Sequence, residues 1–234
     1  MILVITTVSA VPFSCVPGDN DLRTTDGEGS ANLIAAAPSA GVSHFVSTSF
    51  SRNIDDPFPP RNARRATEAT LRGNGMRYTI LRPCCFMEVW LTPAVGFDAA
   101  NAKARIYGTG DAGISYIAVP DSATFAVRSL DAPVAWNAAL EIGGPAPVSQ
   151  VEAVRLFERA AGRPFEVTHV PVDALEAQYA AASDPVRQSL ARLMQCVAHC
   201  DPIDMSGTLQ AIPVRLTSVA EYAERVLRAV PAHV

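Results

Sequence analysis

The first third of the chain alternates apolar strand-like runs with helix-like segments, and this order constrains the fold more than any other feature. Residues 2–8 form a continuous run rich in β-branched residues, which is typical of a strand buried on both faces of a parallel sheet. Further strands are expected at residues 43–49 and 77–82, with helices at residues 25–37 and 61–74 between them. This order predicts an α/β fold with a doubly wound, mostly parallel sheet.

The order changes after residue 102. Residues 103–107 and 114–119 flank several glycines and predict a β-hairpin, and Asp121 is expected to cap a helix that ends at Leu130. The remaining elements that the pattern predicts are a strand at residues 138–142, a helix capped by Ser149 and ended by Gly162, a strand at residues 165–170, and helices at residues 173–199 and 218–230.

We expect one domain over residues 1–234. The chain is 49% apolar and 18% charged, so it can bury a large core. We expect residues 1–102 and 137–144 to form the sheet core, residues 103–136 the hairpin and its helix, and residues 145–234 a small helical C-terminal substrate lobe.

Charge and cysteine content narrow the class of partner and the compartment. The formal net charge is −4, so no basic field is available to hold the phosphates of a nucleic acid. No apolar run approaches the roughly 20 residues that span a bilayer, and the first basic residue is Arg23, which argues against a signal peptide. Five cysteines are an odd number, which favours reduced thiols. We predict a soluble cytoplasmic protein with a small-molecule substrate and no nucleic-acid or membrane partner.

A glycine motif in the middle of the chain matches the dinucleotide-binding pattern only in its letters. Gly108, Gly110 and Gly113 form G-x-G-x-x-G, which binds a pyrophosphate when it follows a strand and opens a helix. Residues 114–119 alternate as a strand, so we interpret these glycines as hairpin turn residues.

Six short stretches of the sequence are informative together. No single stretch is a strong motif, but their order and spacing are specific for one family. The stretches are VITTVSA at residues 4–10, NLIAAA at 32–37, HFVSTS at 44–49, RRATE at 64–68, YTILRP at 78–83 and FME at 86–88. Together they resemble the NmrA-like atypical short-chain dehydrogenases/reductases, the isoflavone-reductase-like branch of the Rossmann enzymes. This resemblance implies an NAD(P)H-dependent oxidoreductase that acts on a small carbonyl, enone or quinone-like substrate, with NADP or NAD as cofactor.

The first residues of this chain resemble a segment from the middle of the family's fold. Members of the family normally open with a strand, a glycine-rich turn and a helix, and two further βα units precede a strand like residues 2–8. We therefore expect an N-terminally truncated Rossmann-like sheet whose edge is open between Ile2 and Val8. Either a second copy covers this edge in a homodimer, or the chain starts downstream of its true N-terminus. We favour the second expectation.

The resemblance also assigns candidate site residues. Arg64 stands where many family members have a lysine near the nicotinamide ribose, so it is the candidate catalytic residue, although its high pKa makes it a poor proton donor. The only lysine, Lys103, cannot form the Tyr-x-x-x-Lys dyad, because Ala99 stands four residues before it. The other cofactor-facing candidates lie at strand ends: Val8, Ser9, Ala10, Thr48, Ser49, Phe50, Pro83, Cys84, Cys85 and Phe86.

Several of these residues have a second interpretation. Arg64 and its neighbours could form a solvated helix face of i,i+4 pairs. Met87 and Trp90 are predicted to wall a substrate pocket, or else to pack in the core. Cys196, His199 and Cys200 lack a fourth ligand at suitable spacing, so we predict core thiols and no metal site. A non-catalytic dinucleotide-sensing module and an inactive truncated remnant stay open as alternative functions.

Overall fold

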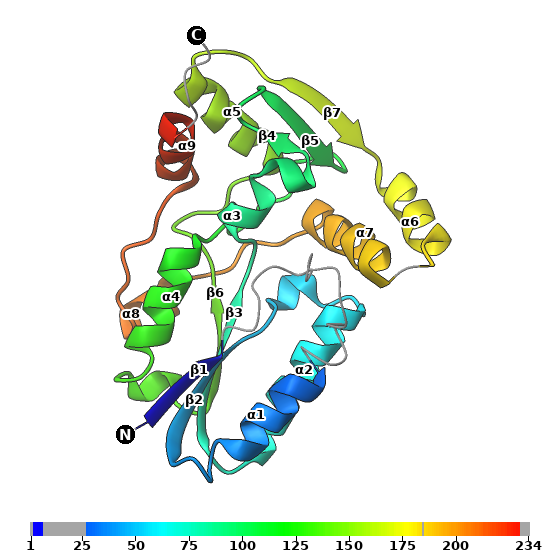
Figure 1. Ribbon diagram of the computed structural model, residues 1–234. Helices are drawn as coiled ribbons and strands as arrows, with labels where there is room; N and C mark the ends of the chain where they lie inside the picture. The colour runs from blue at the N-terminus through cyan, green and yellow to red at the C-terminus, as the bar shows by residue number, and fades with distance from the viewer. Residues whose placement is uncertain (1, 7–26, 184, 230–234) are drawn as a thin grey trace.

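Within the described part of the chain, the main sheet has four parallel strands. The computed structural model describes residues 2–6, 27–183 and 185–229. The strands follow the spatial order β1 (Ile2–Thr6), β2 (Val42–Thr48), β3 (Arg77–Pro83) and β6 (Ala138–Ile142), and every neighbouring pair is parallel (Figure 1). The predicted α/β fold with a doubly wound, mostly parallel sheet is confirmed.

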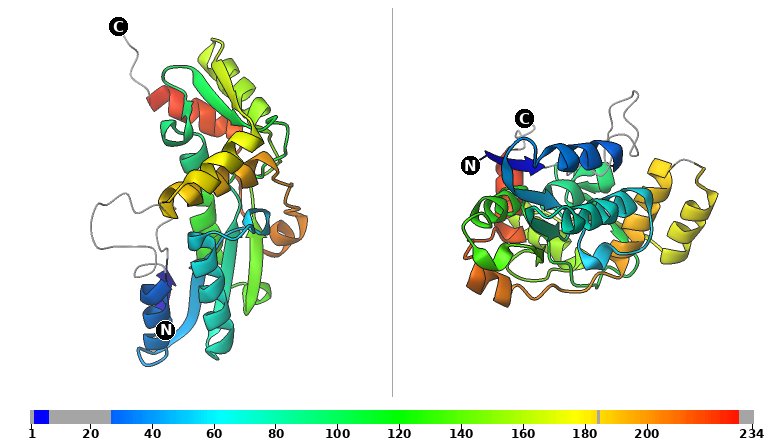
Figure 2. Two further views of the ribbon diagram at one scale, coloured as in Figure 1. Left: turned by 90° about the vertical axis from the view of Figure 1, so that its right-hand side faces the viewer. Right: turned by 90° about the horizontal axis from the view of Figure 1, so that it is seen from below.

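One face of this sheet is covered by α1 (Ser30–Ala36) and α2 (Pro59–Gly73), which lie side by side in Figure 2. Phe45 and Ile80 point to this face and are buried against Leu71 of α2. Leu71 thereby joins α2 to the apolar cluster on this face of the sheet. Helix α1 begins five residues after the predicted start, and residues 25–26 lie outside the described residues.

The opposite face is covered by α4 (Val119–Arg128) and α8 (Ser206–Ala211). Val46 and Leu81, the next residues along the same two strands, are buried here with Phe125 of α4. Successive residues of a strand point to opposite faces of the sheet. Because helices cover both faces, both sets of side chains are buried, and β2 and β3 therefore contain continuous apolar runs.

A second, smaller sheet forms the upper lobe of Figure 1. It contains β4 (Phe97–Asp98), β5 (Lys103–Tyr107) and β7 (Glu166–Val170), with β5 in the middle. Helices α5 (Gln150–Ala161) and α9 (Val219–Ala229) pack beside each other next to this sheet. The strands at residues 103–107 and 165–170 were predicted, but the sequence did not predict that they pair with each other in a sheet of this lobe.

Aromatic side chains form the core of this lobe. The ring of Phe157 lies 4.7 Å from that of Phe97, 6.4 Å from that of Phe165 and 6.5 Å from that of Tyr222, measured between centroids. All three contacts are edge-to-face, which is a favoured geometry for aromatic pairs.

The predicted hairpin is wrong. Strand β5 has β4 on one side and β7 on the other, so neither of its edges is free for residues 114–119. Past β5, the N–H of Gly108 donates to the Val170 carbonyl at 2.9 Å, so the chain continues along β7. Ile114 instead forms an isolated antiparallel bridge to Val148.

Helix α5 follows its local sequence signals closely. The Ser149 hydroxyl accepts a hydrogen bond from the Glu152 N–H at 3.1 Å, and the Ser149 N–H donates to the Glu152 carboxylate at 2.8 Å. Gly162 ends the helix with a left-handed φ of 65°, a conformation that favours glycine. Both predicted ends of this helix are confirmed.

Helix α4 begins three residues before its predicted start, because its N-cap is Ala118 and not Asp121. Pro120 occupies the first turn, where a missing N–H costs nothing, and Asp121 lies in that turn rather than at the cap. Its carboxylate instead accepts hydrogen bonds from the backbone and side chain of Thr217, at 2.7 and 3.2 Å.

The predicted helix at residues 173–199 is two helices, α6 (Val172–Ala181) and α7 (Pro185–Ala198). Pro185 separates them because proline cannot continue a helix that precedes it. Helix α8 was not predicted. The remaining short elements are α3 (Met87–Trp90), η2 (Arg52–Ile54), η3 (Pro93–Val95) and η4 (Pro133–Ala135).

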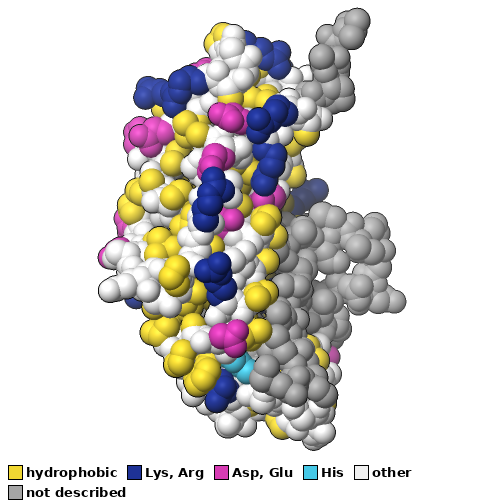
Figure 3. Space-filling model, turned by 90° about the vertical axis from the view of Figure 1, so that its left-hand side faces the viewer, with side chains coloured by type: hydrophobic (Ala, Val, Ile, Leu, Met, Phe, Trp, Pro, Cys, Tyr) yellow, Lys and Arg dark blue, Asp and Glu magenta, His cyan; other side chains and the backbone are white. Residues whose placement is uncertain are grey.

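The surface over α4, α8 and α9 mixes charges of both signs with apolar side chains (Figure 3). Arg215 pairs with Glu221 at 2.5 Å, and Arg225 pairs with Glu88 at 3.4 Å. This face therefore carries no extended field of one sign. Within the described residues, no helix has both the length and the apolar character that crossing a membrane requires.

Candidate functional site

The loops after β2 and β3 are held side by side at the carboxyl edge of the main sheet. Beyond the end of β2, the N–H of Ser49 donates to the Leu81 carbonyl at 2.7 Å, and that of Ser51 donates to the Pro83 carbonyl at 3.2 Å. The parallel ladder thus continues into both loops. Ligands of open α/β sheets bind outside this edge.

This arrangement brings most of the predicted cofactor-facing residues together. Thr48, Ser49 and Phe50 follow one another at the end of β2, and residues 83–86 follow the end of the neighbouring strand β3. The predicted residues Val8, Ser9 and Ala10 lie outside the described residues.

Arg64 reaches this edge from α2. Its guanidinium donates to the carbonyl of Thr48 at 3.5 Å, and only 8% of the residue is exposed. Glu68, one turn later, is 2% exposed. The alternative interpretation of a solvated helix face is therefore wrong, because this side of α2 turns toward the sheet.

Arg65 fixes the loop after β2. It donates to the Ser49 hydroxyl at 3.1 Å and to the Phe50 carbonyl at 2.9 Å, and it pairs with Asp55 at 3.0 Å. Arg61 also contacts Asp55. Burial alone raises the pKa of this carboxyl, but hydrogen bonds from the two arginines outweigh it, so the pKa of Asp55 is lowered.

Glu68 is the centre of a buried ion network beneath the edge. Its carboxylate contacts Arg65 at 2.7 Å, Arg72 at 3.0 Å and Arg82 of β3 at 2.5 Å. Burial raises the pKa of Glu68, but the hydrogen bonds from Arg82 and Ser49 and the nearby positive charges outweigh burial and lower the pKa to about 2.

The network extends to the next strand. Arg82 also contacts Glu141 of β6 at 3.4 Å, and Glu141 accepts a hydrogen bond from the Ser51 hydroxyl at 2.7 Å. Neither Arg82 nor Glu141 was predicted from the sequence as part of the site. The sequence signal that could have indicated them is a charged residue near the end of each apolar strand.

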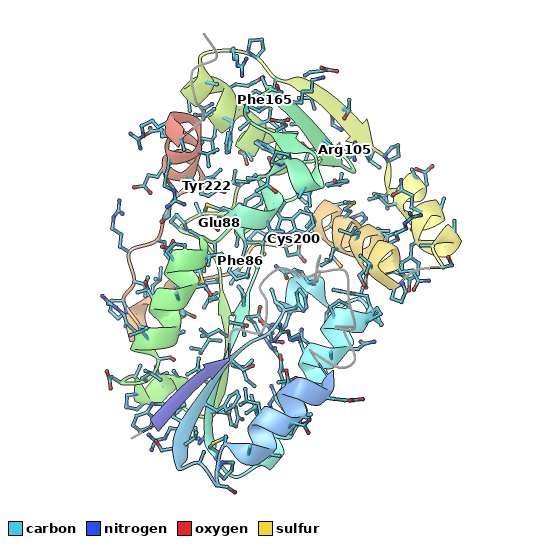
Figure 4. The ribbon with its side chains drawn as sticks, viewed as in Figure 1. Phe86, Glu88, Arg105, Phe165, Cys200 and Tyr222 are labelled. Atoms are coloured by element: carbon cyan, nitrogen blue, oxygen red, sulfur yellow. The ribbon has the colours of Figure 1, made fainter. Side chains whose placement is uncertain are left out.

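Three thiols meet at the same edge. The sulfurs of Cys84 and Cys200 are 3.7 Å apart, and Cys85 hydrogen-bonds to both. The hydrogen bond to Cys200, with burial, raises the pKa of Cys84, and both thiol contacts and burial raise that of Cys85. Cys84 and Cys85 therefore stay protonated at neutral pH, whereas hydrogen bonds from these two thiols outweigh burial and lower the pKa of Cys200 to about 4. Figure 4 shows Cys200 in the middle of the molecule, between the main sheet and the upper lobe.

The two predicted pocket residues lie just beyond these thiols. Met87 is fully buried within the apolar core. Trp90 lines a small internal cavity with Tyr107 and Tyr116. A substrate pocket walled by Met87 and Trp90 stays a prediction.

A larger hollow of about 360 Å³ opens between the loop after β2 and α7. The loop contributes Arg52, Asn53, Asp55 and Asp56. The end of α7 and the residues after it contribute Gln195, Cys196, His199 and Asp201.

Two contacts join the walls of this hollow. The side-chain amide of Asn53 donates to the Asp201 carbonyl, and Arg192 of α7 pairs with Asp56 at 3.6 Å. Burial, followed by the charge of Asp56, raises the pKa of Cys196 to about 12, so this wall also carries a neutral thiol. The volume is at the lower end of the range typical of ligand pockets, roughly 300–1,000 Å³.

The glycine motif lies elsewhere. Gly108, Gly110 and Gly113 connect β5 to Ile114 in the upper lobe, and no helix begins there. A Cβ on Gly110 would come within 2.4 Å of Ile106, so this glycine serves close packing. The prediction that the motif does not bind a dinucleotide agrees with this placement, although it is not a hairpin turn.

A model of the NmrA-like family matches residues 4–223. The chain belongs to this family. The NmrA-like chain is 32% identical over 186 residues to an NAD(P)H azoreductase of Xenophilus azovorans, an alignment that covers 78% of this chain and 63% of that protein. It is 28% identical to the photosystem II assembly factor Ycf39 of Trieres chinensis, covering 67% of this chain and 49% of that protein.

The fold of this NmrA-like chain is similar to a solved structure. An NADPH-dependent quinone oxidoreductase of Escherichia coli, solved in complex with NADPH, superposes with a TM-score of 0.72 and 21% identity. The match covers 96% of this chain and 75% of that one. At this identity the likeness concerns the fold. The chain spans between about half and two thirds of the length of the two curated relatives.

Proposed function

We propose that the chain is an NAD(P)H-dependent reductase. In this proposal the carboxyl edge of the main sheet holds the nicotinamide end of NADP or NAD, and a small carbonyl, enone or quinone-like acceptor binds beside it. The observation that carries the proposal is the meeting of the β2 and β3 loops and Arg64 at one edge, in a chain of the NmrA-like family. The hollow adjoins the same β2 loop further along, at residues 52–56.

The residues of this edge fit the nicotinamide end of the cofactor. Arg64 offers N–H donors for a ribose hydroxyl or a phosphate oxygen, and the loops at residues 48–50 and 83–86 supply backbone groups beside it. The bound cofactor would supply a hydride, and the protein would position it. Arg64 binds without giving up its proton, because the pKa of a guanidinium lies far above neutral pH.

The neighbouring thiols would keep this edge dry. Cys84 and Cys85 are buried and protonated, so they exclude water, whereas the lowered pKa of Cys200 places a thiolate 3.7 Å from the Cys84 sulfur. The C-terminal lobe, residues 145–234, would then act as the substrate lobe, since α7 supplies the far wall of the hollow.

Equilibrium binding tests this proposal. Titration calorimetry of NADPH and NADH is expected to show micromolar binding to the intact chain, at least tenfold weaker in Arg64→Met. Arg72→Met is the matched control, because Arg72 lies on the same helix but is 44% exposed. Arg64→Lys places the family's lysine at this position and is expected to keep binding and raise turnover.

Turnover is then followed as loss of NADPH absorbance with a quinone, an enone and an azo compound. Thermal unfolding of each variant verifies that it is folded. If neither cofactor binds at millimolar concentration, the reductase proposal is wrong.

A non-catalytic dinucleotide-binding module is the second candidate. Two observations favour it: Arg64 replaces a proton-donating lysine, and one relative is named an assembly factor. Cofactor binding without oxidation in the presence of any of the three acceptors would support this candidate over the reductase.

Self-association through β1 is a further part of the proposal. Strand β1 is at the end of the described sheet order, with β2 on one side only. An unpaired strand edge is a template for a second chain. Sedimentation velocity is expected to show a homodimer, and Ile5→Pro, which removes a backbone donor from β1, is expected to shift it to monomer. A monomer at all concentrations would contradict self-association.

A further inference from the structure

The hollow between the β2 loop and α7 contains a buried acceptor without a partner. Gln195 is 5% exposed and lines the hollow, yet its side-chain carbonyl has no hydrogen bond. Leaving such a group unpaired leaves its desolvation cost uncompensated. A buried polar group of this kind points to a ligand that supplies the missing donor.

The other buried glutamine shows what a satisfied amide looks like in this fold. Gln150 is 7% exposed, and its carbonyl accepts from the Tyr107 N–H at 2.9 Å while its amide donates to the Tyr107 carbonyl at 3.0 Å. Gln150 thereby ties α5 to β5. Gln195 makes no equivalent connection through its carbonyl.

The charged groups in the lining of the hollow are mostly acceptors. Asp55, Asp56 and Asp201 bring three carboxylates against the single guanidinium of Arg52. Arg52 pairs with Glu141 at 3.5 Å, outside the lining.

The donor of the Asn53 side chain is also committed, because its amide already donates to the Asp201 carbonyl. Among the charged groups of the lining, acceptors therefore outnumber donors, and the neutral donors that stay are the His199 ring, the Gln195 amide and the Cys196 thiol.

One carboxylate is available without competition. Arg61 and Arg65 contact Asp55, and Arg192 contacts Asp56. Among the described residues, the Asp201 carboxylate is in no ion pair, and the residue is exposed at the mouth of the hollow. A ligand cation can pair with Asp201 without displacing an arginine.

We propose that this hollow binds a small organic cation that carries N–H donors, an ammonium or an amidinium, with the Gln195 carbonyl and the Asp201 carboxylate as its two acceptors. The inference rests on the proposed function in one respect: the acceptor substrate of the reductase would carry this group. It deepens that proposal, because it assigns a positive charge to the substrate.

The test uses benzamidine as the probe and the intact chain without cofactor. Benzamidine is an amidinium, benzamide is its neutral analogue and benzoate is an anion of the same shape. Titration calorimetry is expected to show benzamidine binding at least tenfold more tightly than benzamide, with no binding of benzoate. Equal binding of benzamidine and benzoate, or no binding of benzamidine at millimolar concentration, would overturn the inference.

Two variants locate the site. Gln195→Leu and Asp201→Asn are each expected to weaken benzamidine binding at least tenfold. Asp173→Asn is the control, because it makes the same change of charge in the exposed first turn of α6, outside the lining. Wild-type affinity in both hollow variants would place the cation elsewhere and contradict the inference.

The outcome is independent of the reductase. NADPH binding without benzamidine binding would leave the reductase standing and remove the cationic substrate. Benzamidine binding that depends on Gln195, in a chain that binds neither cofactor, would support the cation site and remove the reductase.

Discussion

Two polar regions lie at the same edge of the main sheet, and they differ in how their groups are paired. In the Glu68 network, every charged group that we describe faces an opposite charge: Arg82 contacts both Glu68 and Glu141, and Arg65 and Arg72 contact Glu68. In the hollow beside α7, the Gln195 carbonyl and the Asp201 carboxylate face no donor within the described residues.

This difference separates structure from binding. The paired charged groups of the Glu68 network connect α2, β3 and β6 and stabilise the edge of the sheet. Because each of these groups already has a partner of opposite charge, none is available to bind a ligand. The unpaired groups of the hollow have a desolvation cost in the free protein, and a ligand that hydrogen-bonds to them can offset this cost. We therefore assign the ion network to stability and the hollow to recognition.

The largest effect is expected from a substitution that removes a charge from the Glu68 network. Arg82→Met leaves Glu68 buried beside weaker partners, and removal of one partner from a buried ion pair typically costs about 3–5 kcal/mol. Urea unfolding is expected to show a loss of this size. Arg72→Met is the control, because Arg72 contacts the same carboxylate but is 44% exposed, and exposed pairs contribute about 1 kcal/mol or less. Equal losses in the two variants would contradict the assignment.

The second prediction concerns pH. The pKa of Glu68 is lowered to about 2 in the folded chain from an ordinary value of 4.5. A lowered carboxyl pKa stabilises the fold above the unfolded value, and that stability is lost as pH falls through the folded value. The free energy of unfolding is therefore expected to fall between about pH 4.5 and about pH 2.

The Arg82→Met variant sharpens this prediction. Without its strongest partner, the pKa of Glu68 rises toward its ordinary value, so the variant is expected to lose less stability over the same pH interval. Urea midpoints of the two chains over a pH series measure this. Parallel curves would mean that Glu68 is not the titrating group.

The smallest expected effect is in the upper lobe. Lys103 and Glu166 form an ion pair at 3.2 Å, but their side chains are 60% and 67% exposed. Lys103→Met is expected to change the free energy of unfolding by less than about 1 kcal/mol. A loss comparable to that of Arg82→Met would show that pairing, rather than burial, decides the contribution.

How far the sequence predicted the structure depends on how local each signal is. Helix α5 was placed correctly because Ser149, Glu152 and Gly162 determine its ends within one segment. The hairpin was wrong because the partner of β5 is β7, about 60 residues later, and no local pattern reports which distant strand takes an edge.

The candidate site divides in the same way. The strand-end residues Thr48 to Phe50 and 83–86 could be placed at one edge because parallel strands end together. The hollow could not be predicted, since Asn53 and Gln195 come from segments about 140 residues apart. Their approach is decided by how α7 packs against η2, a tertiary contact that periodicity does not encode.

The most direct test of the account compares the two buried glutamines in the same free protein. Gln150→Leu removes both bonds to the Tyr107 backbone and is expected to lower the free energy of unfolding by about 2 kcal/mol. Gln195→Leu removes a carbonyl that has no partner and is expected to leave that free energy unchanged or raise it. Urea unfolding of both variants, side by side, gives the answer. A loss in Gln195→Leu as large as that in Gln150→Leu would show that the Gln195 carbonyl is already satisfied within the protein, and the distinction between the two regions would fail.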